Sequence, residues 1–344
     1  MSSTAQAINR RIVLDHRPVG EPTAANFRLE KQPVPAAGPE QLLLRTRYLS
    51  LDPYMRGRMS DAPSYAPPVA VGDVMTGQTV SVVEASNAAG FNVGDLVLAT
   101  VGWQDYAVLD ARQVQKIDPS IPRLSYALGV LGMPGLTAWV GLLEIGQPQP
   151  GETVVVSAAT GGVGSVVGQI AKLKGCRVVG IAGGTQKCEF AVQTLGFDAC
   201  LDHREPQLRE RLAEAAPKGI DVYFENVGGA VLAAVLPLLN THARIPVCGL
   251  VAWYNLAKLP EGVDRTPALL TTVLKQRLKL QGYIIFDHWH RLPQFYQEMS
   301  AWVLEGKVKY REEILDGLEA APEGLLGMLR GENFGKLVVR VSGS

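Results

Sequence analysis

The chain has 344 residues with 33 basic and 33 acidic side chains, so its formal net charge is zero, and 47% of its residues are hydrophobic. This length suits two domains, and the composition is that of an ordinary globular protein. The balanced charge gives no reason to expect a nucleic-acid partner. No apolar run reaches the ~20 residues of a membrane-spanning helix, so no membrane partner is expected either. Because no apolar stretch follows Arg10 and Arg11, a secretory signal is not expected and we predict a cytoplasmic protein.

The first part of the chain, to about residue 125, has the pattern of short strands. Apolar and β-branched runs are separated at short intervals by Gly, Pro and Asn or Asp residues, which is typical of a β-barrel or a β-sandwich. Segment 58–73 is rich in Pro, Ser and Asp, and we predict a long functional loop there. The predicted strands are 41–51, 79–85, 95–102 and 105–109.

From Tyr126 onward, predicted strands alternate with predicted helices, which indicates a parallel sheet. Segment 127–146 has a helical pattern with an internal break at Pro134. The last strand-like runs are expected to rejoin the first domain, because a lone terminal hairpin would be only marginally stable. The predicted elements after residue 150 are strand 153–156, helix 165–175, strand 177–182, a further helix-to-strand segment that ends at residue 202, helix 204–216, strand 219–229, helix 230–239, strand 243–251 and the terminal strands 309–315 and 335–341.

A glycine-rich turn lies between strand 153–156 and helix 165–175. Small residues let the backbone turn tightly and approach a pyrophosphate, and the start of the helix offers N–H groups to that anion. Ala159 stands where the usual fingerprint has its first glycine. The position of the turn predicts a dinucleotide site, and the alternative is a glycine-rich turn without a ligand. Its residues are Ala159, Thr160, Gly161, Gly162, Val163 and Gly164, followed by Ser165.

The residues after the second strand of this region bear on which dinucleotide binds. An NAD enzyme places Asp or Glu there to bind the ribose hydroxyls, but segment 177–184 contains neither. Lys187 follows three residues later, and His203 and Arg204 follow the next strand. Because a 2′-phosphate is bound by positive charge, NADP(H) is favoured over NAD(H). The sequence leaves open whether His203 or Arg204 contacts the phosphate.

The next two strand ends supply further candidates, since the carboxyl ends of parallel strands face the ligand crevice. Asn226 follows strand 219–229 beside Gly228 and Gly229, where its amide could bind ribose or nicotinamide. The alternative is an asparagine that only forms the turn. Cys248 and Gly249 end the following strand on the same edge.

The cysteines and histidines do not have the spacing of a metal site. His288 and His290 are close in sequence but have no third ligand nearby, so no metal is expected. No two cysteines form a CxxC pair, and free buried thiols are expected. The cysteines are Cys176, Cys188, Cys200 and Cys248.

Long stretches of the chain are similar to known proteins. They are LSLDPYMRGRMSD, GVLGMPGLTAW, GLLEIGQP, GGVGSVVGQIAKLKGCRVVGIAGGTQKC, YFENVGG, LPLLNTHARIPVCGLV, YNLAKLP and ENFGK. On these stretches the chain resembles the medium-chain dehydrogenase/reductase superfamily, in its zinc-free branch of prostaglandin reductases and plant double-bond reductases. The clustered cysteines and the Gly-His-Glu motif of the zinc-binding branch are absent from the sequence.

The resemblance implies an α/β protein of two domains that forms homodimers. A GroES-like β-barrel domain would comprise 1–128 and 306–344, and a Rossmann domain with a doubly wound parallel sheet would comprise 129–305. The family has a tyrosine where His203 stands and a serine where Gly184 stands. The cofactor contacts implied by the resemblance are Gly162 to Ser165, Lys187, Asn226, Cys248 through Tyr254 including Gly249, Tyr283, Ile284, Ile285 and Asn333.

The resemblance also implies the reaction. The chain would use NADPH to reduce the carbon–carbon double bond of a small enone or enal by hydride transfer to the β-carbon. Tyr254 and then Tyr54 are the candidates for donating a hydrogen bond to the carbonyl oxygen as an enolate forms, although each could instead be a packing residue. The alternatives are a quinone reductase of the same fold and a non-catalytic NADPH-binding protein.

Overall fold

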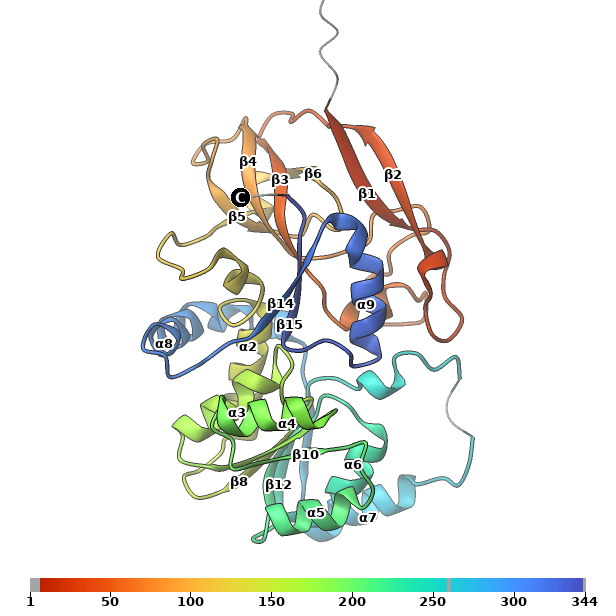
Figure 1. Ribbon diagram of the computed structural model, residues 1–344, viewed down its shortest axis with the longest axis vertical. Helices are drawn as coiled ribbons and strands as arrows, with labels where there is room; N and C mark the ends of the chain where they lie inside the picture. Colours follow the sequence, from red (N-terminus) through yellow and green to blue (C-terminus); the bar gives the residue numbers. More distant parts are fainter. Residues whose placement is uncertain (1–6, 259–260, 343–344) are drawn as a thin grey trace, which may run out of the picture. The chain divides into compact units, whose positions relative to one another are not determined.

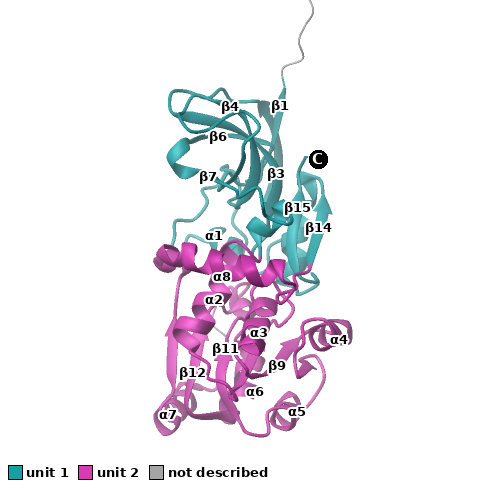
Figure 2. Cartoon of the chain, turned by 90° about the vertical axis from the view of Figure 1, so that its left-hand side faces the viewer, with its two compact units in different colours: residues 1–129, 312–344 teal, residues 130–311 magenta. Residues whose placement is uncertain are grey.

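The computed structural model describes residues 7–258 and 261–342, so the similar stretch 254–260 ends outside the described residues. The chain divides into two units, coloured separately in Figure 2. Unit 1 contains residues 1–129 and 312–344, and unit 2 contains residues 130–311. The sequence-based boundaries differ from these at both junctions, and residues 306–311 lie in unit 2.

Unit 1 is built on a seven-stranded sheet in the order β14-β15-β3-β4-β5-β7, with β6 paired to β3 (Figure 1). The four strands predicted from the first part of the sequence are β3 to β6. A separate antiparallel pair, β1 and β2, was not predicted. The bounds are β1 Ile8–Leu14, β2 Phe27–Pro33, β3 Gln41–Ser50, β4 Thr79–Ser86, β5 Leu96–Ala99, β6 Tyr106–Asp110, β7 Gln115–Lys116, β14 Glu312–Asp316 and β15 Lys336–Arg340.

The two terminal strands rejoin unit 1, as predicted, but they do not form a hairpin. Strands β14 and β15 are parallel, and β15 pairs antiparallel with β3. Helix α9 (Ala321–Leu329) lies between them in sequence, because parallel neighbours need a crossover connection. The hairpin was inferred from strand patterns alone, without the helical segment that separates them.

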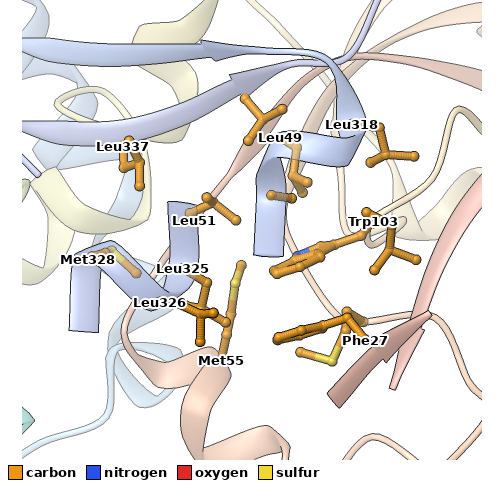
Figure 3. Packing of buried hydrophobic residues seen from close by; sticks show 14 of the residues in the cluster. Phe27, Leu49, Leu51, Met55, Trp103, Leu318, Leu325, Leu326, Met328 and Leu337 are labelled. Atoms are coloured by element: carbon orange, nitrogen blue, oxygen red, sulfur yellow. The ribbon is translucent and has the colours of Figure 1, made fainter. Parts of the chain in front are cut away.

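The core of unit 1 forms where α9 and β3 meet (Figure 3). Leu325 of α9 is fully buried with Leu49 and Met55, and the rings of Phe27 and Trp103 stack with centroids 5.4 Å apart. Met55 belongs to the short helix α1 (Tyr54–Arg58), which follows β3. This packing holds the start of α1 firmly against the sheet.

A buried ion pair fixes the junction between β3 and α1. Lys336 and Asp52 have side chains only 3% and 8% exposed, and Nζ of Lys336 donates to the Asp52 carboxylate at 2.8 Å. The same Nζ donates to the carbonyl of Leu51 at 2.6 Å, and Ser50 donates to Asp52. Two residues beyond Asp52 the chain reaches Tyr54, whose backbone is therefore well anchored.

Unit 2 contains a six-stranded sheet in the order β10-β9-β8-β11-β12-β13, and every neighbouring pair is parallel. All five residues of β8 are buried, as expected for a strand covered on both faces. The order reverses direction between β8 and β11, which makes that point the topological switch point of the sheet. The strands are β8 Thr153–Ser157, β9 Arg177–Ala182, β10 Ala199–Asp202, β11 Ile220–Phe224, β12 Leu239–Val247 and β13 Lys279–Gly282.

The helices of unit 2 follow the predicted alternation with one correction. Pro134 does not break a helix: it lies in the first turn of α2, where a missing N–H costs no hydrogen bond. A π-helical turn, Gly141–Gly146, continues α2. Among the described residues, no helix is long and apolar enough to span a membrane. The helices are α2 Met133–Val140, α3 Gly164–Leu173, α4 Thr185–Gln193, α5 Leu208–Ala215, α6 Gly229–Val235, α7 Thr266–Gln276 and α8 Leu292–Leu304.

Candidate functional site

The carboxyl edge of the unit 2 sheet gathers most of the predicted site residues. Because the six strands are parallel, the segments that follow them all emerge at this one edge. Gly161 to Ser165 follow β8, Lys187 follows β9, His203 follows β10, Asn226 follows β11, Cys248 to Tyr254 follow β12, and Tyr283 to Ile285 follow β13. Tyr54 and Asn333 lie in unit 1.

The glycine-rich turn brings the start of α3 against the end of β8. Ala158 leaves the strand with a φ of 50°, and the N–H of Gly161 donates back to its carbonyl at 3.0 Å. A Cβ atom on Gly164 would lie 2.3 Å from the same carbonyl oxygen, so only glycine allows this approach. At the start of α3 the N–H of Ser165 donates to the carbonyl of Gly161 at 3.1 Å, and the N–H of Val166 donates to the carbonyl of Val163 at 3.0 Å. The positive end of the helix dipole at this turn favours an anion such as a phosphate.

A group of basic side chains surrounds the turn after β9. A Cβ atom on Gly183 would lie 3.1 Å from both Nη2 of Arg204 and Nε2 of His203, and one on Gly184 would lie 3.5 Å from Nη1 of Arg204. Gly184 has a φ of 100°, which an L side chain rarely adopts. Helix α4 begins at Thr185, one residue after Gly184, and Lys187 lies in its first turn. The side chains of Arg204 and His203 therefore lie directly against the backbone of Gly183, where any side chain would displace them.

The ionisable side chains near Gly183 differ in charge at neutral pH. Desolvation lowers the pKa of His203, and the positive charges of Arg204 and Lys187 lower it further against the opposing effect of Asp202. The imidazole is therefore uncharged at neutral pH. The carboxylate of Asp202 accepts the N–H of Arg204 at 3.0 Å, and such bonds hold its pKa below the ordinary value despite desolvation. Arg204 and Lys187 supply the positive charge of the group.

The end of β11 is tied to the end of β8 through Asn226. Its Nδ2 donates to the carbonyl of Ser157 at 2.8 Å, and its backbone N–H donates to the Ser157 hydroxyl at 2.8 Å. Sequence reasoning missed the preceding residue, Glu225, which is only 1% exposed. The available signal was a carboxylate directly before Asn226 at a strand end.

A loop that contains Cys248 and Tyr254 follows β12, and the buried Tyr283 follows β13. The hydroxyl of Tyr254 accepts the N–H of Leu250 at 3.5 Å, and a Cβ atom on Gly249 would lie 3.2 Å from it. Desolvation and the charge of Glu225 raise the pKa of Cys248 to about 11, so this thiol stays protonated at neutral pH. The hydroxyl of Tyr283 donates to the Thr137 carbonyl at 2.8 Å, and burial raises its pKa.

Tyr54 and Asn333 are fixed by contacts within unit 1. Desolvation and then the charge of Asp52 raise the pKa of Tyr54, so its phenol stays protonated and can donate a hydrogen bond. The guanidinium of Arg58 lies 5.8 Å from the centre of the Tyr54 ring. Asn333 donates to the carbonyl of Gly335 at 2.8 Å, in the segment before β15.

Comparisons with known proteins match the chain almost end to end. A family model described as the N-terminal domain of oxidoreductase matches residues 10–117, and one described as zinc-binding dehydrogenase matches residues 162–302. Among the described residues, no group of three or more His, Cys, Asp and Glu side chains is arranged to hold a metal ion.

Individual relatives are similar over nearly their full length. The NADPH-dependent curcumin reductase of Escherichia coli K12 is 60% identical over 336 residues, which cover 97% of each chain. The 2-alkenal reductase (NADP(+)-dependent) of Nicotiana tabacum is 40% identical over 341 residues, covering 97% of this chain and 98% of that protein. The crystal structure of CurA in complex with NADPH from Vibrio vulnificus superposes with a TM-score of 0.95 at 56% identity, covering 97% and 100% of the two chains.

Proposed function

The chain belongs to the medium-chain dehydrogenase/reductase family, and from this we propose that it uses NADPH to reduce the carbon–carbon double bond of α,β-unsaturated ketones and aldehydes. The resemblance predicted from the sequence, to this family and within it to bacterial NADPH-dependent curcumin reductase, is confirmed by the relatives. The observation that supports the cofactor assignment is the position of Arg204 and His203 against Gly183 at the end of β9.

The residues of unit 2 fit a phosphorylated dinucleotide. Gly164 lets the start of α3 approach the end of β8 closely, as in a pyrophosphate-binding turn, and Gly183 lets Arg204 and His203 lie against the turn after β9. In our proposal Gly161 to Ser165 bind the pyrophosphate, and Arg204 and Lys187 bind the 2′-phosphate together with His203. The nicotinamide half is assigned to Asn226, Cys248 to Tyr254, Tyr283 to Ile285 and Asn333.

The protein's part in the chemistry is to orient the substrate and to stabilise charge. When bound, NADPH supplies the hydride that adds to the β-carbon of the substrate. Negative charge then builds on the carbonyl oxygen, and a phenol that donates a hydrogen bond to it stabilises the resulting enolate. We assign this donor role first to Tyr254 and second to Tyr54. One such donor lowers the barrier by roughly 3 kcal/mol, and the α-carbon then takes up a proton.

The test follows the loss of NADPH absorbance with an enone, with a quinone and without substrate. Consumption with the enone supports the proposal, consumption with only the quinone favours a quinone reductase, and tight NADPH binding without turnover favours a non-catalytic binding protein. Tyr254→Phe is expected to lower turnover about 100-fold, from the ~3 kcal/mol of an oxyanion donor, with NADPH affinity changed less than about two-fold. An unchanged turnover would move the donor role to Tyr54, whose phenylalanine variant is the parallel measurement.

We also propose a homodimer formed through the edge of the unit 2 sheet. Strand β13 ends the strand order, and the edge of a sheet offers unpaired N–H and C=O groups. Helix α7 has no buried residue, and its Leu270 and Leu274 are 59% and 77% exposed. Helix α7 packs against β12, the neighbour of this edge strand, and its exposed apolar side chains favour an interface between copies. Light scattering should give a dimer, and Leu274→Glu should give a monomer; a monomeric parent protein would contradict the proposal.

A cytoplasmic location is proposed as well. All four cysteines are free thiols, and thiols persist in reducing compartments. Fractionation of cells that express the protein tests this location, since recovery from an extracytoplasmic fraction would refute it.

A further inference from the structure

A buried carboxylate at the switch point of the sheet is not used by the proposed chemistry. Glu225 is 1% exposed, and its Oε1 accepts four hydrogen bonds. The donors are the N–H of Val227 at 2.7 Å, the N–H of Gly228 at 2.9 Å, the hydroxyl of Tyr223 at 3.0 Å and the hydroxyl of Ser157 at 3.2 Å, which shares its hydrogen with the carbonyl of Phe224 at 3.3 Å. One oxygen atom therefore holds the turn after β11 and reaches the end of β8.

The backbone of Glu225 ties the same turn to β12. Its N–H donates to the carbonyl of Pro246 at 3.0 Å, and its own carbonyl accepts the N–H groups of Cys248 at 2.9 Å and Gly249 at 3.1 Å. Three strand ends, those of β8, β11 and β12, are joined through this residue. They lie on both sides of the switch point, where open α/β sheets bind their ligands.

The turn 225–229, which Glu225 holds, is hydrogen-bonded to the loop 248–254 after β12. The N–H of Val251 donates to the carbonyl of Asn226 at 3.2 Å, and the N–H of Ala252 donates to the carbonyl of Val227 at 3.0 Å. This loop ends at Tyr254. The placement of the Asn226 amide and of the loop that carries Tyr254 therefore depends on the turn that the carboxylate fixes.

The other oxygen of the carboxylate indicates that stability alone does not explain Glu225. Its Oε2 is buried and has no hydrogen-bond partner within residues 7–258 and 261–342. A buried oxygen without a partner is costly, and native proteins retain few of them. Because Oε2 destabilises the fold, we explain the presence of Glu225 at this ligand-binding edge by the geometry that its Oε1 gives to the turn 225–229.

We infer that Glu225 is a positioning residue for the nicotinamide half of the cofactor. It acts through the turn 225–229, which sets the Asn226 amide and the 248–254 loop, and it does not contribute to the binding of the adenosine 2′-phosphate half. The inference rests on the proposed NADPH-dependent function.

The test separates the two halves of the cofactor by their affinities. Dissociation constants are measured by calorimetry for NADPH and for adenosine 2′,5′-bisphosphate, which lacks the nicotinamide half. Glu225→Ala should raise the constant for NADPH at least about ten-fold, which equals about 1.4 kcal/mol, and change that for the bisphosphate less than about two-fold. At saturating NADPH its kcat should fall while the KM for the enone changes little.

Two further variants keep the test decisive. Glu225→Gln retains an oxygen that accepts the N–H groups of Val227 and Gly228, so it should recover part of the NADPH affinity; it also replaces Glu225→Ala if that variant does not fold. The matched control is Asp221→Asn at the amino end of the same strand. Its carboxylate accepts the N–H of Thr153 at 2.8 Å and the amide of Asn240 at 2.8 Å, and its loss should leave both affinities unchanged.

Three results would overturn the inference. The first is a Glu225→Ala protein that binds NADPH as tightly as the parent protein does. The second is an equal loss of affinity for NADPH and for the bisphosphate, which would mark a general structural role. If the parent protein itself binds neither compound, the proposed function fails, and the inference about Glu225 fails with it.

Discussion

Removing the guanidinium of Arg204 should change the choice of cofactor. Three of its nitrogen atoms lie within 3.5 Å of the positions that a Cβ atom would occupy on Gly183 or Gly184. A hydrogen bond to a charged group contributes about 1.5–3 kcal/mol. Arg204 is exposed, and solvent screens exposed charges, so the lower limit applies. A loss of about 1.5 kcal/mol corresponds to roughly a ten-fold weaker binding of NADPH.

The assay compares the dissociation constants of NADPH and NADH for the parent protein and for Arg204→Ala. The constant for NADH should change less than about two-fold, because NADH has no 2′-phosphate. Raising the ionic strength should reduce the difference in NADPH affinity between the parent protein and Arg204→Ala. Arg209→Ala is the control, since Arg209 is an exposed arginine of α5 whose partner is Glu210 at 2.8 Å. An equal loss of affinity for both cofactors would refute the assignment of Arg204 to the phosphate.

Three other perturbations test separate features. In the protein without cofactor, desolvation lowers the pKa of His203, and a phosphate dianion bound beside the imidazole should raise that pKa again. The parent protein should therefore gain NADPH affinity over His203→Gln as the pH falls from about 7 to 6. A ratio of the two dissociation constants that does not change with pH would contradict this. Gly168→Ala should destabilise unit 2 by about 2 kcal/mol in urea unfolding, since its Cβ would lie 1.9 Å from the buried ring of Phe197, and an unchanged midpoint would show that the ring can move. Lys336→Met should cost about 3 kcal/mol by leaving the Asp52 carboxylate buried without its partner; in the same unfolding assay, replacing both residues by apolar ones should recover much of that loss.

The periodicity of the sequence predicted most of the sheet in unit 2, because its strands are continuous apolar runs between helical segments. The same reasoning placed Asn226 and Lys187 at the carboxyl edge, since that edge follows from strand direction alone. It misjudged Pro134, because a proline inside a helical pattern can also mark the start of a helix. Local patterns do not distinguish these two cases when the preceding segment is apolar as well.

The features that the sequence did not predict depend on contacts between distant residues. The parallel pairing of β14 with β15 depends on a helix whose packing against β3 is not a local property. Glu225 has the same neighbours in sequence whether its carboxylate points into solvent or into the turn. Only the positions of Ser157 and Tyr223 show that the carboxylate is buried and which donors it accepts. Arg204 and His203 lie equally close to Gly183, and Arg204 is the stronger candidate because desolvation lowers the pKa of the imidazole, which the sequence does not show.

The pairing of β3 with β15 has a consequence for synthesis of the protein. Unit 2 is one continuous segment, so it has all its residues as soon as residue 311 has left the ribosome. Strand β3 is made much earlier, yet its neighbour β15 and the lysine that neutralises Asp52, 284 positions away, emerge later. The nascent chain therefore carries an open strand edge and an uncompensated carboxylate while unit 2 folds. Chaperones that shield exposed strand edges should engage unit 1 during this interval.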